Sequence, residues 1–159
     1  MDENIVIRES DLLTVVGINA AIPEFLDGSG NAYSLKHFAD KITGKRHFIL
    51  IAYYNNEAVG YIVAYDQLND GSFYCWMAGV IPDFRRQGIL KALMDYLFEK
   101  SEKMGYEKIR IKTRNDRRAM LSYLVSHDFL VTGFIPDPDS DALKNQILFE
   151  RCIDTENLV

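Results

Sequence analysis

The residues with the clearest capacity for chemistry lie in the stretch VIPDFRRQGIL, residues 80–90, where a strand is expected to end and a helix to begin. The first amides of a helix lack backbone acceptors and carry the positive end of the helix dipole, so such a junction can bind an anion. Gly88 lets the backbone approach a ligand where a Cβ would collide, and Arg85 and Arg86 add positive charge. These features favour a phosphate site. An ordinary tight turn with solvated arginines fits the physical arguments equally well.

The segments on either side of this turn must hold it in place. Residues 72–81, SFYCWMAGVI, have the composition of a strand. After Pro82 the apolar residues recur at helical spacing, which predicts a helix of about seventeen residues that stops before Gly105. Residues 107–114, EKIRIKTR, alternate like a strand again. Strand, helix and strand in this order predict a βαβ unit whose two strands are parallel.

The first seventy residues predict two helices followed by a hairpin. A short strand in NIVIRE precedes a helix capped by Ser10 or Asp11, and a loop with Pro23 then leads to a second helix over about Tyr33–Ile42. From His47 onward the residue composition is typical of strands. HFILIAYY and EAVGYIVAYD are the two predicted strands, with turns at Asn55–Asn56 and NDG.

The last forty-five residues predict a helix and two strands. Asn115 can cap a helix that runs to about His127, and FLVTGFI and QILFERCI read as strands around the loop PDPDSDALKN. The full order is βααβββαβαββ. We therefore expect an α/β (α+β) fold: one domain over residues 1–159, with a mostly antiparallel mixed sheet, one parallel pair and helices on both faces.

The turn also carries a family pattern. Val80-x-Pro82-x-x-Arg85-x-x-Gly88-Ile89, with Phe84 at the aromatic position, resembles the acyl-CoA signature of the GNAT superfamily of N-acyltransferases. The resemblance is strong over about Phe73 to Phe129 and rests on topology before that. It implies acetyl-CoA as co-substrate, with Val80 on the pantetheine and oxyanion side. The residues it assigns to the phosphate turn are Arg85, Arg86, Gln87, Gly88, Ile89, Leu90 and Lys91.

The chain departs from the family pattern at two places. Leu90 stands where the family usually has Gly or Ala; its amide survives, but its side chain must find space in the helix–sheet contact. Members commonly carry a tyrosine as general acid at the position of Leu124, whereas here the hydroxyl is displaced by one residue to Tyr123. One residue is a rotation of about 100° on a helix, so Tyr123 would face the sulfur only if the helix were offset or bulged. Tyr123 is thus a candidate general acid or a packing residue.

By the same resemblance, Asn115 meets the pantetheine through its side-chain amide, although a plain helix cap is an equal alternative. The implied reaction is direct attack of an amine on the thioester with both substrates bound. No acidic residue occurs in residues 72–81, where many relatives place a glutamate, and no other carboxylate stands out as the base. The carboxylates considered are Glu24, Asp27, Glu57 and Asp66, with a water chain as a substitute; His37, His47 and His127 are weaker candidates.

Composition excludes several other classes of protein. The chain has 48% hydrophobic residues and a formal charge of −5, which gives no broad basic face for nucleic acid. No apolar run approaches the length of a membrane span, and the start lacks the features of a signal peptide, so we expect a soluble cytoplasmic protein. Cys75 and Cys152 are expected to be buried free thiols, and no motif supports a metal.

One basic pattern remains outside these assignments. Lys108, Arg110, Lys112 and Arg114 alternate along one strand and read as a solvated face. The alternative is that some of them, or Arg117 and Arg118, reach the CoA 3′-phosphate.

The favoured function is N-acetylation of a small-molecule or protein amine, with a homodimer left open. The acidic surface mildly favours a cationic acceptor. A CoA-binding sensor or scaffold without turnover is the second hypothesis. A protein-interaction domain without cofactor is the third, and it leaves the glycine–arginine turn unexplained.

Overall fold

The computed structural model describes residues 4–153, which divide into two compact units. Unit 1 comprises residues 4–66 and 76–100, and unit 2 comprises residues 67–75 and 101–153. The strands follow the order β1-β2-β3-β4-β5-β7-β6 in one seven-stranded sheet, and β4 (Ser72–Val80) contributes residues to both units. The mixed α/β fold class is confirmed.

Unit 1 is built on antiparallel strands. β1 (Ile5–Glu9) pairs with β2 (His47–Tyr54), which pairs with β3 (Glu57–Tyr65). Asn55 and Asn56 join β2 to β3 with φ of 48° and 70°. A two-residue hairpin turn with two positive φ angles matches the twist of the strands, and asparagine tolerates that conformation. The hairpin predicted at this dipeptide is therefore confirmed.

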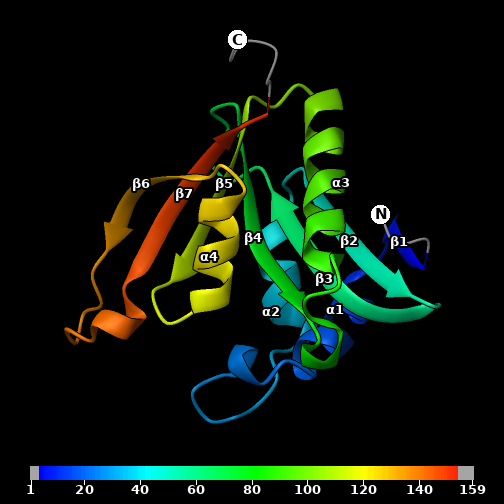
Figure 1. Cartoon of the computed structure of the whole chain (residues 1–159), viewed down its shortest axis with the longest axis horizontal. Helices are drawn as coiled ribbons and strands as arrows, with labels where there is room; N and C mark the ends of the chain where they lie inside the picture. The colour runs from blue at the N-terminus through cyan, green and yellow to red at the C-terminus, as the bar shows by residue number, and fades with distance from the viewer. Residues whose placement is uncertain (1–3, 154–159) are drawn as a thin grey trace. The chain divides into compact units, whose positions relative to one another are not determined.

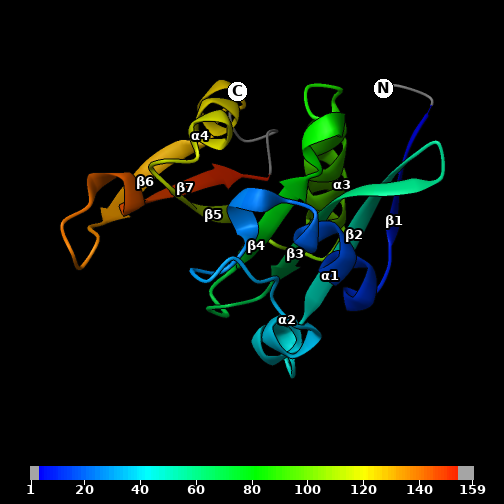
Figure 2. The same cartoon turned by 90° about the horizontal axis from the view of Figure 1, so that it is seen from below.

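Three helices flank the strands of unit 1: α1 (Leu12–Ala20), α2 (Leu35–Ile42) and most of α3 (Ile89–Lys103). Neighbouring residues of β3 show the arrangement. A Cβ on Gly60 would lie 3.1 Å from Cγ2 of Ile89 in α3, while the hydroxyl of Tyr61 accepts a 2.7 Å hydrogen bond from Nδ2 of Asn19 in α1. Successive strand residues point to opposite faces. Helices α1 and α3 therefore cover opposite faces, and Figure 2 shows α2 on the side away from α3.

Both N-terminal helices begin at side-chain caps. Asp11 accepts a 2.9 Å hydrogen bond from the amide of Thr14, as the sequence predicts, and Ser34 accepts one of 3.3 Å from the amide of His37. Such a cap satisfies one of the unpaired amides at a helix start. The cap at Ser34 makes α2 begin at Leu35, two residues later than predicted.

Unit 2 holds the parallel pair. The first residues of β4 pair in parallel with β5 (Lys108–Arg114), from Ser72 opposite Lys108 to Cys75 opposite Ile111. Beyond β5 the order continues through β7 (Gln146–Cys152) to β6 (Leu130–Ile135), both antiparallel. Helix α4 (Arg118–Ser126) lies on one face of these strands (Figures 1 and 2). The predicted βαβ unit is confirmed, with α3 fifteen residues long rather than seventeen.

Two local predictions in unit 2 are wrong. Asn115 does not cap α4: the cap residue is Arg117, and Nδ2 of Asn115 donates instead to the carbonyl of Ala142 at 3.1 Å. Arg118 also donates to Oδ1 of Asn115 at 2.9 Å, which takes up the acceptor that a cap would use. Cys75 is buried as predicted, but Cys152 is exposed, since the strand alternation that buries Phe149 turns Cys152 away.

No helix within residues 4–153 combines the length and apolar character needed to cross a bilayer.

Candidate functional site

The predicted anion turn follows directly from the end of β4. The chain leaves Val80 through a short 3-10 turn, η2 (Pro82–Phe84), and enters α3 after positive φ angles of 63° at Arg86 and 82° at Gly88. The first helical hydrogen bond runs from the amide of Ala92 to the carbonyl of Gly88, at 3.0 Å. The amides of residues 86–91 donate to no acceptor among the described residues. Together with the helix dipole, this row of amides can bind an anion.

Gly88 leaves room above these amides. A Cβ built on Gly88 would meet nothing within 4 Å, and residues 85–88 are exposed. An L-residue is strained at this φ, and its side chain would extend into the space in front of the turn. The turn therefore fits a diphosphate, because its donors are unpaired and the glycine keeps the approach open.

The three cations of the turn are used differently. The guanidinium of Arg85 binds the carboxylate of Glu24 and donates from Nε to the carbonyl of Val80 at 3.1 Å. Nζ of Lys91 lies 2.7 Å from Oδ2 of Asp95 in an exposed pair one helical turn away. Arg86 is exposed and has no partner within the described part of the chain. Arg86 is thus the side chain left to add positive charge for a phosphate.

A loop of unit 1 covers the end of β4. A Cβ on Gly79 would lie 2.5 Å from Cε2 of Phe25 and 2.8 Å from Cδ1 of Ile22, far below ordinary contact distances. Phe25 belongs to a second 3-10 turn, η1 (Pro23–Phe25), and so does Glu24, the partner of Arg85. Sequence reasoning missed Gly79, although a glycine inside a strand signals a close approach.

Leu90 does not occupy the position that the sequence suggested. Leu90 is half-buried, whereas Ile89 is buried and packs beside Gly60. The helix–sheet contact is therefore filled by Ile89, and Gly60 makes the space for it. The leucine at the sixth motif position needs no compensating change in the sheet.

An aromatic cluster lies on the α2 side of unit 1. The ring of His37 stacks on Tyr33 with centroids 4.2 Å apart and lies 5.8 Å from Trp76, over which Nζ of Lys41 sits at 5.9 Å. Burial lowers the pKa of His37, and the charge of Lys41 lowers it further, against an opposing effect of Asp40. Sequence reasoning ranked His37 low, because a helical histidine gives no sign of its neighbours.

The remaining predicted site residues lie in unit 2. The ring of Tyr123 stacks on His127 with centroids 3.9 Å apart, and Nδ1 of His127 is 2.8 Å from the carbonyl of Tyr123. Tyr123 is half-buried, while its neighbour Leu124 is fully buried. Helix α4 is regular over Arg118–Ser126, so no bulge turns the hydroxyl toward the side that Leu124 occupies. Asn115 is held by Ala142 and Arg118, as described above.

The candidate carboxylate bases have separate surroundings. Glu24 is committed to Arg85, and Oδ1 of Asp27 accepts the amides of Ser29 and Asn31, both at 2.9 Å. Glu57 is exposed at the start of β3, and Asp66 follows the end of that strand. Among residues 4–153, no group of three or more His, Cys, Asp or Glu side chains could hold a metal ion.

Comparisons with known proteins show the family of this chain. The sequence model of the Acetyltransferase (GNAT) family matches residues 18–129. A search of curated proteins finds no match.

Three solved structures illustrate the similarity of fold. The ribosomal-protein-S18-alanine N-acetyltransferase of Escherichia coli is 20% identical, with a TM-score of 0.74 and 95% of each chain covered. A GNAT family acetyltransferase of Elizabethkingia anophelis with acetyl-CoA bound is 20% identical, with a TM-score of 0.73 over 95% of this chain and 99% of that one. Naa50 of Arabidopsis thaliana, in complex with the bisubstrate analogue CoA-Ac-MVNAL, is 17% identical, with a TM-score of 0.72 over 93% and 98%.

Proposed function

Because the chain belongs to the GNAT family of acetyltransferases, we propose that it transfers the acetyl group of acetyl-CoA to a primary amine of a small molecule or a protein. The observation that carries the proposal is the row of unpaired amides at residues 86–91, beside the open approach at Gly88. This chain is similar in fold to solved structures that have acetyl-CoA or the bisubstrate analogue CoA-Ac-MVNAL bound.

Each residue of the turn has a role in the proposal. The amides of Arg86, Gln87, Gly88, Ile89, Leu90 and Lys91 donate to the diphosphate, with Arg86 adding charge. Arg85 acts indirectly, because it binds Glu24 and the carbonyl of Val80 rather than the diphosphate. Val80 offers main-chain groups to the pantetheine, and the family resemblance names Asn115 as a further candidate. Bound acetyl-CoA supplies an acetyl group activated as a thioester.

The reaction also requires two proton transfers, one from the amine acceptor and one to the departing sulfur. An amine acceptor with a pKa of about 10 has to lose a proton before it can attack. With Glu24 paired and no acidic residue in β4, we propose that water carries this proton from the site to solvent. Donors placed before the reaction stabilise charge that develops on the carbonyl oxygen, and the amide of Val80 is the candidate. Tyr123 is the candidate acid for the departing sulfur, which needs little help because an ordinary thiol has a pKa of about 8.5.

A second candidate is a CoA-binding sensor without turnover. It is favoured by the burial of Leu124 at the position where relatives carry the acid, and by the pairing of Glu24. Both candidates require the turn to bind acetyl-CoA. They differ in whether free CoA thiol is released when an amine is present.

Thiol release across a panel of amines tests the proposal. The protein is mixed with acetyl-CoA and, in turn, a polyamine, an aminoglycoside, free amino acids and peptides with free N-termini. We expect at least one amine to raise CoA release above the rate without acceptor, and Tyr123→Phe to lower that rate about tenfold or less, since acid catalysis contributes little to a good leaving group. Binding of acetyl-CoA without release by any amine would favour the sensor.

We also propose a cytoplasmic location. Cys152 is an exposed free thiol, and reduced thiols persist in reducing compartments. Fractionation of cells that express the protein tests this.

A further inference from the structure

A small pocket lies within unit 2, on the strand face that carries the basic residues. Its volume is about 220 Å³, and its walls come from four strands and the segment before β4. The lining residues that matter here are Arg110 and Lys112 of β5, Thr132 and Ile135 of β6, Leu148 of β7, and Tyr74 of β4. The proposed acetyl transfer assigns no role to this pocket.

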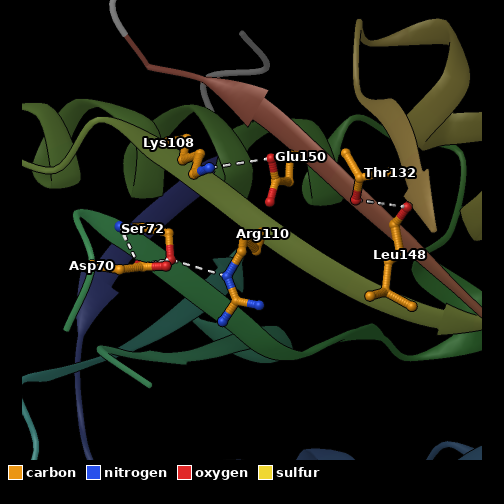
Figure 3. Close-up of polar contacts among 7 residues, drawn as sticks. All are labelled: Asp70, Ser72, Lys108, Arg110, Thr132, Leu148 and Glu150. Carbon is orange, nitrogen blue, oxygen red and sulfur yellow. Dashed lines mark hydrogen bonds and ion pairs between the residues drawn. The ribbon is translucent and has the colours of Figure 1, made fainter. Parts of the chain in front are cut away.

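Arg110 is held in a fixed orientation at the pocket wall. Its Nε donates to Oγ of Ser72 at 3.0 Å (Figure 3). Its Nη2 donates to Oε1 of Gln67 at 2.8 Å, and its Cζ lies 5.4 Å from the ring centroid of Tyr74. Ser72 in turn donates to Asp70. Nη1 of Arg110 has no partner among the described residues, so the guanidinium keeps donors for a ligand.

Of the four basic residues of β5, Lys112 has no partner within the described part of the chain. It lies two residues after Arg110, on the same face of β5, and is half-buried. Within residues 4–153 its ammonium makes no hydrogen bond or ion pair. Its strand neighbours do pair: Lys108 lies 3.3 Å from Glu150, and Arg114 binds Asp116. A partly desolvated ammonium without a counter-ion favours an anion from solution.

The charges on this face leave a net positive site. Lys108, Arg110 and Lys112 lie near two carboxylates, Asp70 and Glu150, and Glu150 pairs with Lys108 (Figure 3). The pKa of Asp70 is lowered first by its hydrogen bonds with Ser72 and then by the charges of Arg110 and Lys108, so this carboxylate is ionised and belongs to the Arg110 network. The site is thus locally cationic in a chain whose formal charge is −5.

The opposite wall of the pocket is apolar. Leu148 lies directly across from Lys112 in the β5–β7 register, and Ile135 lies on β6 beyond it. The hydroxyl of Thr132 donates to the carbonyl of Leu148 at 3.5 Å, which leaves its oxygen able to accept. The volume is below the roughly 300–1,000 Å³ of pockets that enclose drug-sized ligands. The occupant is therefore small, with one anionic end and one short apolar end.

We propose that this pocket binds a carboxylate attached to a short branched apolar group, with the carboxylate at Lys112 and Arg110 and the apolar group against Leu148 and Ile135. Two sources share this chemistry: a free branched acid, and the C-terminal leucine of a peptide. The proposal does not depend on acetyl transfer, since it concerns residues of unit 2 that the transfer chemistry does not use.

Binding of 4-methylpentanoate, followed by NMR in the absence of acetyl-CoA, tests the proposal. We expect saturable shifts of the amides of Thr132, Ile135 and Leu148, and at least tenfold weaker binding of the uncharged 4-methylpentanamide. A peptide ending in leucine, with a free or an amidated C-terminus, distinguishes the two sources: tighter binding of the free-ended peptide than of the acid indicates a peptide. Equal binding of acid and amide would overturn the proposal.

Matched variants locate the effect. Lys112→Met should weaken binding of the acid at least tenfold and Lys112→Arg should retain it, while Lys36→Met removes an equal charge from an exposed pair in unit 1 and should leave binding unchanged. The retained binding in Lys112→Arg guards against a folding defect. Binding to Lys112→Met as tight as to the wild type would contradict the site. So would displacement of the acid by adenosine 3′,5′-bisphosphate, because the pocket would then belong to the nucleotide end of CoA.

Discussion

The guanidinium of Arg85 binds the carboxylate of Glu24, which precedes it by 61 residues, and also holds the carbonyl of Val80. This contact joins three parts of unit 1: the end of β4, the turn that leads into α3 and the loop of η1. The two adjacent arginines therefore have different roles. Arg85 positions the loop, and Arg86 is the residue that we propose to bind the phosphate.

Alanine substitution of each arginine tests whether Arg85 and Arg86 have these different roles. Arg86→Ala should weaken acetyl-CoA binding about tenfold, the effect of losing one charge-assisted contact, whereas Arg85→Ala should weaken it about twofold. Because the Arg85–Glu24 pair is partly exposed, at 41% and 32% for the two side chains, Arg85→Ala should cost less than about 1 kcal/mol of stability. Calorimetric titration of both variants measures the difference. A larger loss in Arg85→Ala than in Arg86→Ala would reverse the assignment.

The packing of η1 on β4 predicts that Gly79 tolerates no side chain. Gly79→Ala would place a methyl group 2.5 Å from the ring of Phe25, so we expect a loss of about 1–3 kcal/mol in the free energy of unfolding, as in other overpacked sites. Gly17→Ala is the control: Gly17 lies inside α1 with nothing within 4 Å of a Cβ, and the change should stabilise by about 0.5–1 kcal/mol. Urea denaturation measures both. A Gly79→Ala protein with the free energy of unfolding of the wild type would mean that η1 does not pack tightly on β4.

The environment of His37 predicts a pH effect on stability. Its pKa lies below the ordinary value of 6.5, because burial and Lys41 disfavour the charged ring. As the pH falls, the unfolded chain therefore takes up this proton first, so the contribution of His37 is complete above pH 6.5 and is lost as the pH falls toward the folded-state pKa. Denaturation between pH 7.5 and 5 should show a smaller loss of stability in His37→Phe than in the wild type. NMR titration of the imidazole with a midpoint at or above 6.5 would refute this explanation.

The two cysteines should react differently. Burial raises the pKa of Cys75 to about 12, whereas Cys152 is exposed. Because the thiolate is the reactive form, a thiol reagent at pH 8 should modify one cysteine in the folded protein and two after denaturation. Cys152→Ser should abolish the reaction of the folded protein. Rapid modification of two thiols in the folded state would show that Cys75 is accessible.

Much of the fold could be predicted from sequence, because periodicity and punctuation are local signals. Asn55–Asn56 predicted its hairpin through the preference of asparagine for positive φ, and the alternation of residues 107–114 predicted β5. The cap at Asn115 could not be judged in this way. Its side chain is taken by Ala142, 27 residues away, and no local pattern encodes that competitor.

The site shows the same limit. The shape of the turn before α3 was predictable because Gly88 and the start of α3 are neighbours in sequence. The pairing of Arg85 with Glu24 was not, since it depends on how η1 packs on Gly79. The basic residues of β5 were expected to be solvated. Lys108 and Arg110 instead have partners in other segments, and Arg114 binds Asp116 two residues further on. Lys112 stands out only once those partners are known.

The central claim is that the unpaired amides opening α3 bind the diphosphate of acetyl-CoA while Gly88 keeps the approach clear. Calorimetric titration of acetyl-CoA into Gly88→Leu tests it, with Gly105→Leu as control, because Gly105 has a similar φ of 87° and equally open surroundings in unit 2. Both variants carry the same backbone strain, about 1–2 kcal/mol. We predict binding heat for the wild type and Gly105→Leu and none for a folded Gly88→Leu protein. Wild-type affinity in Gly88→Leu would contradict the account.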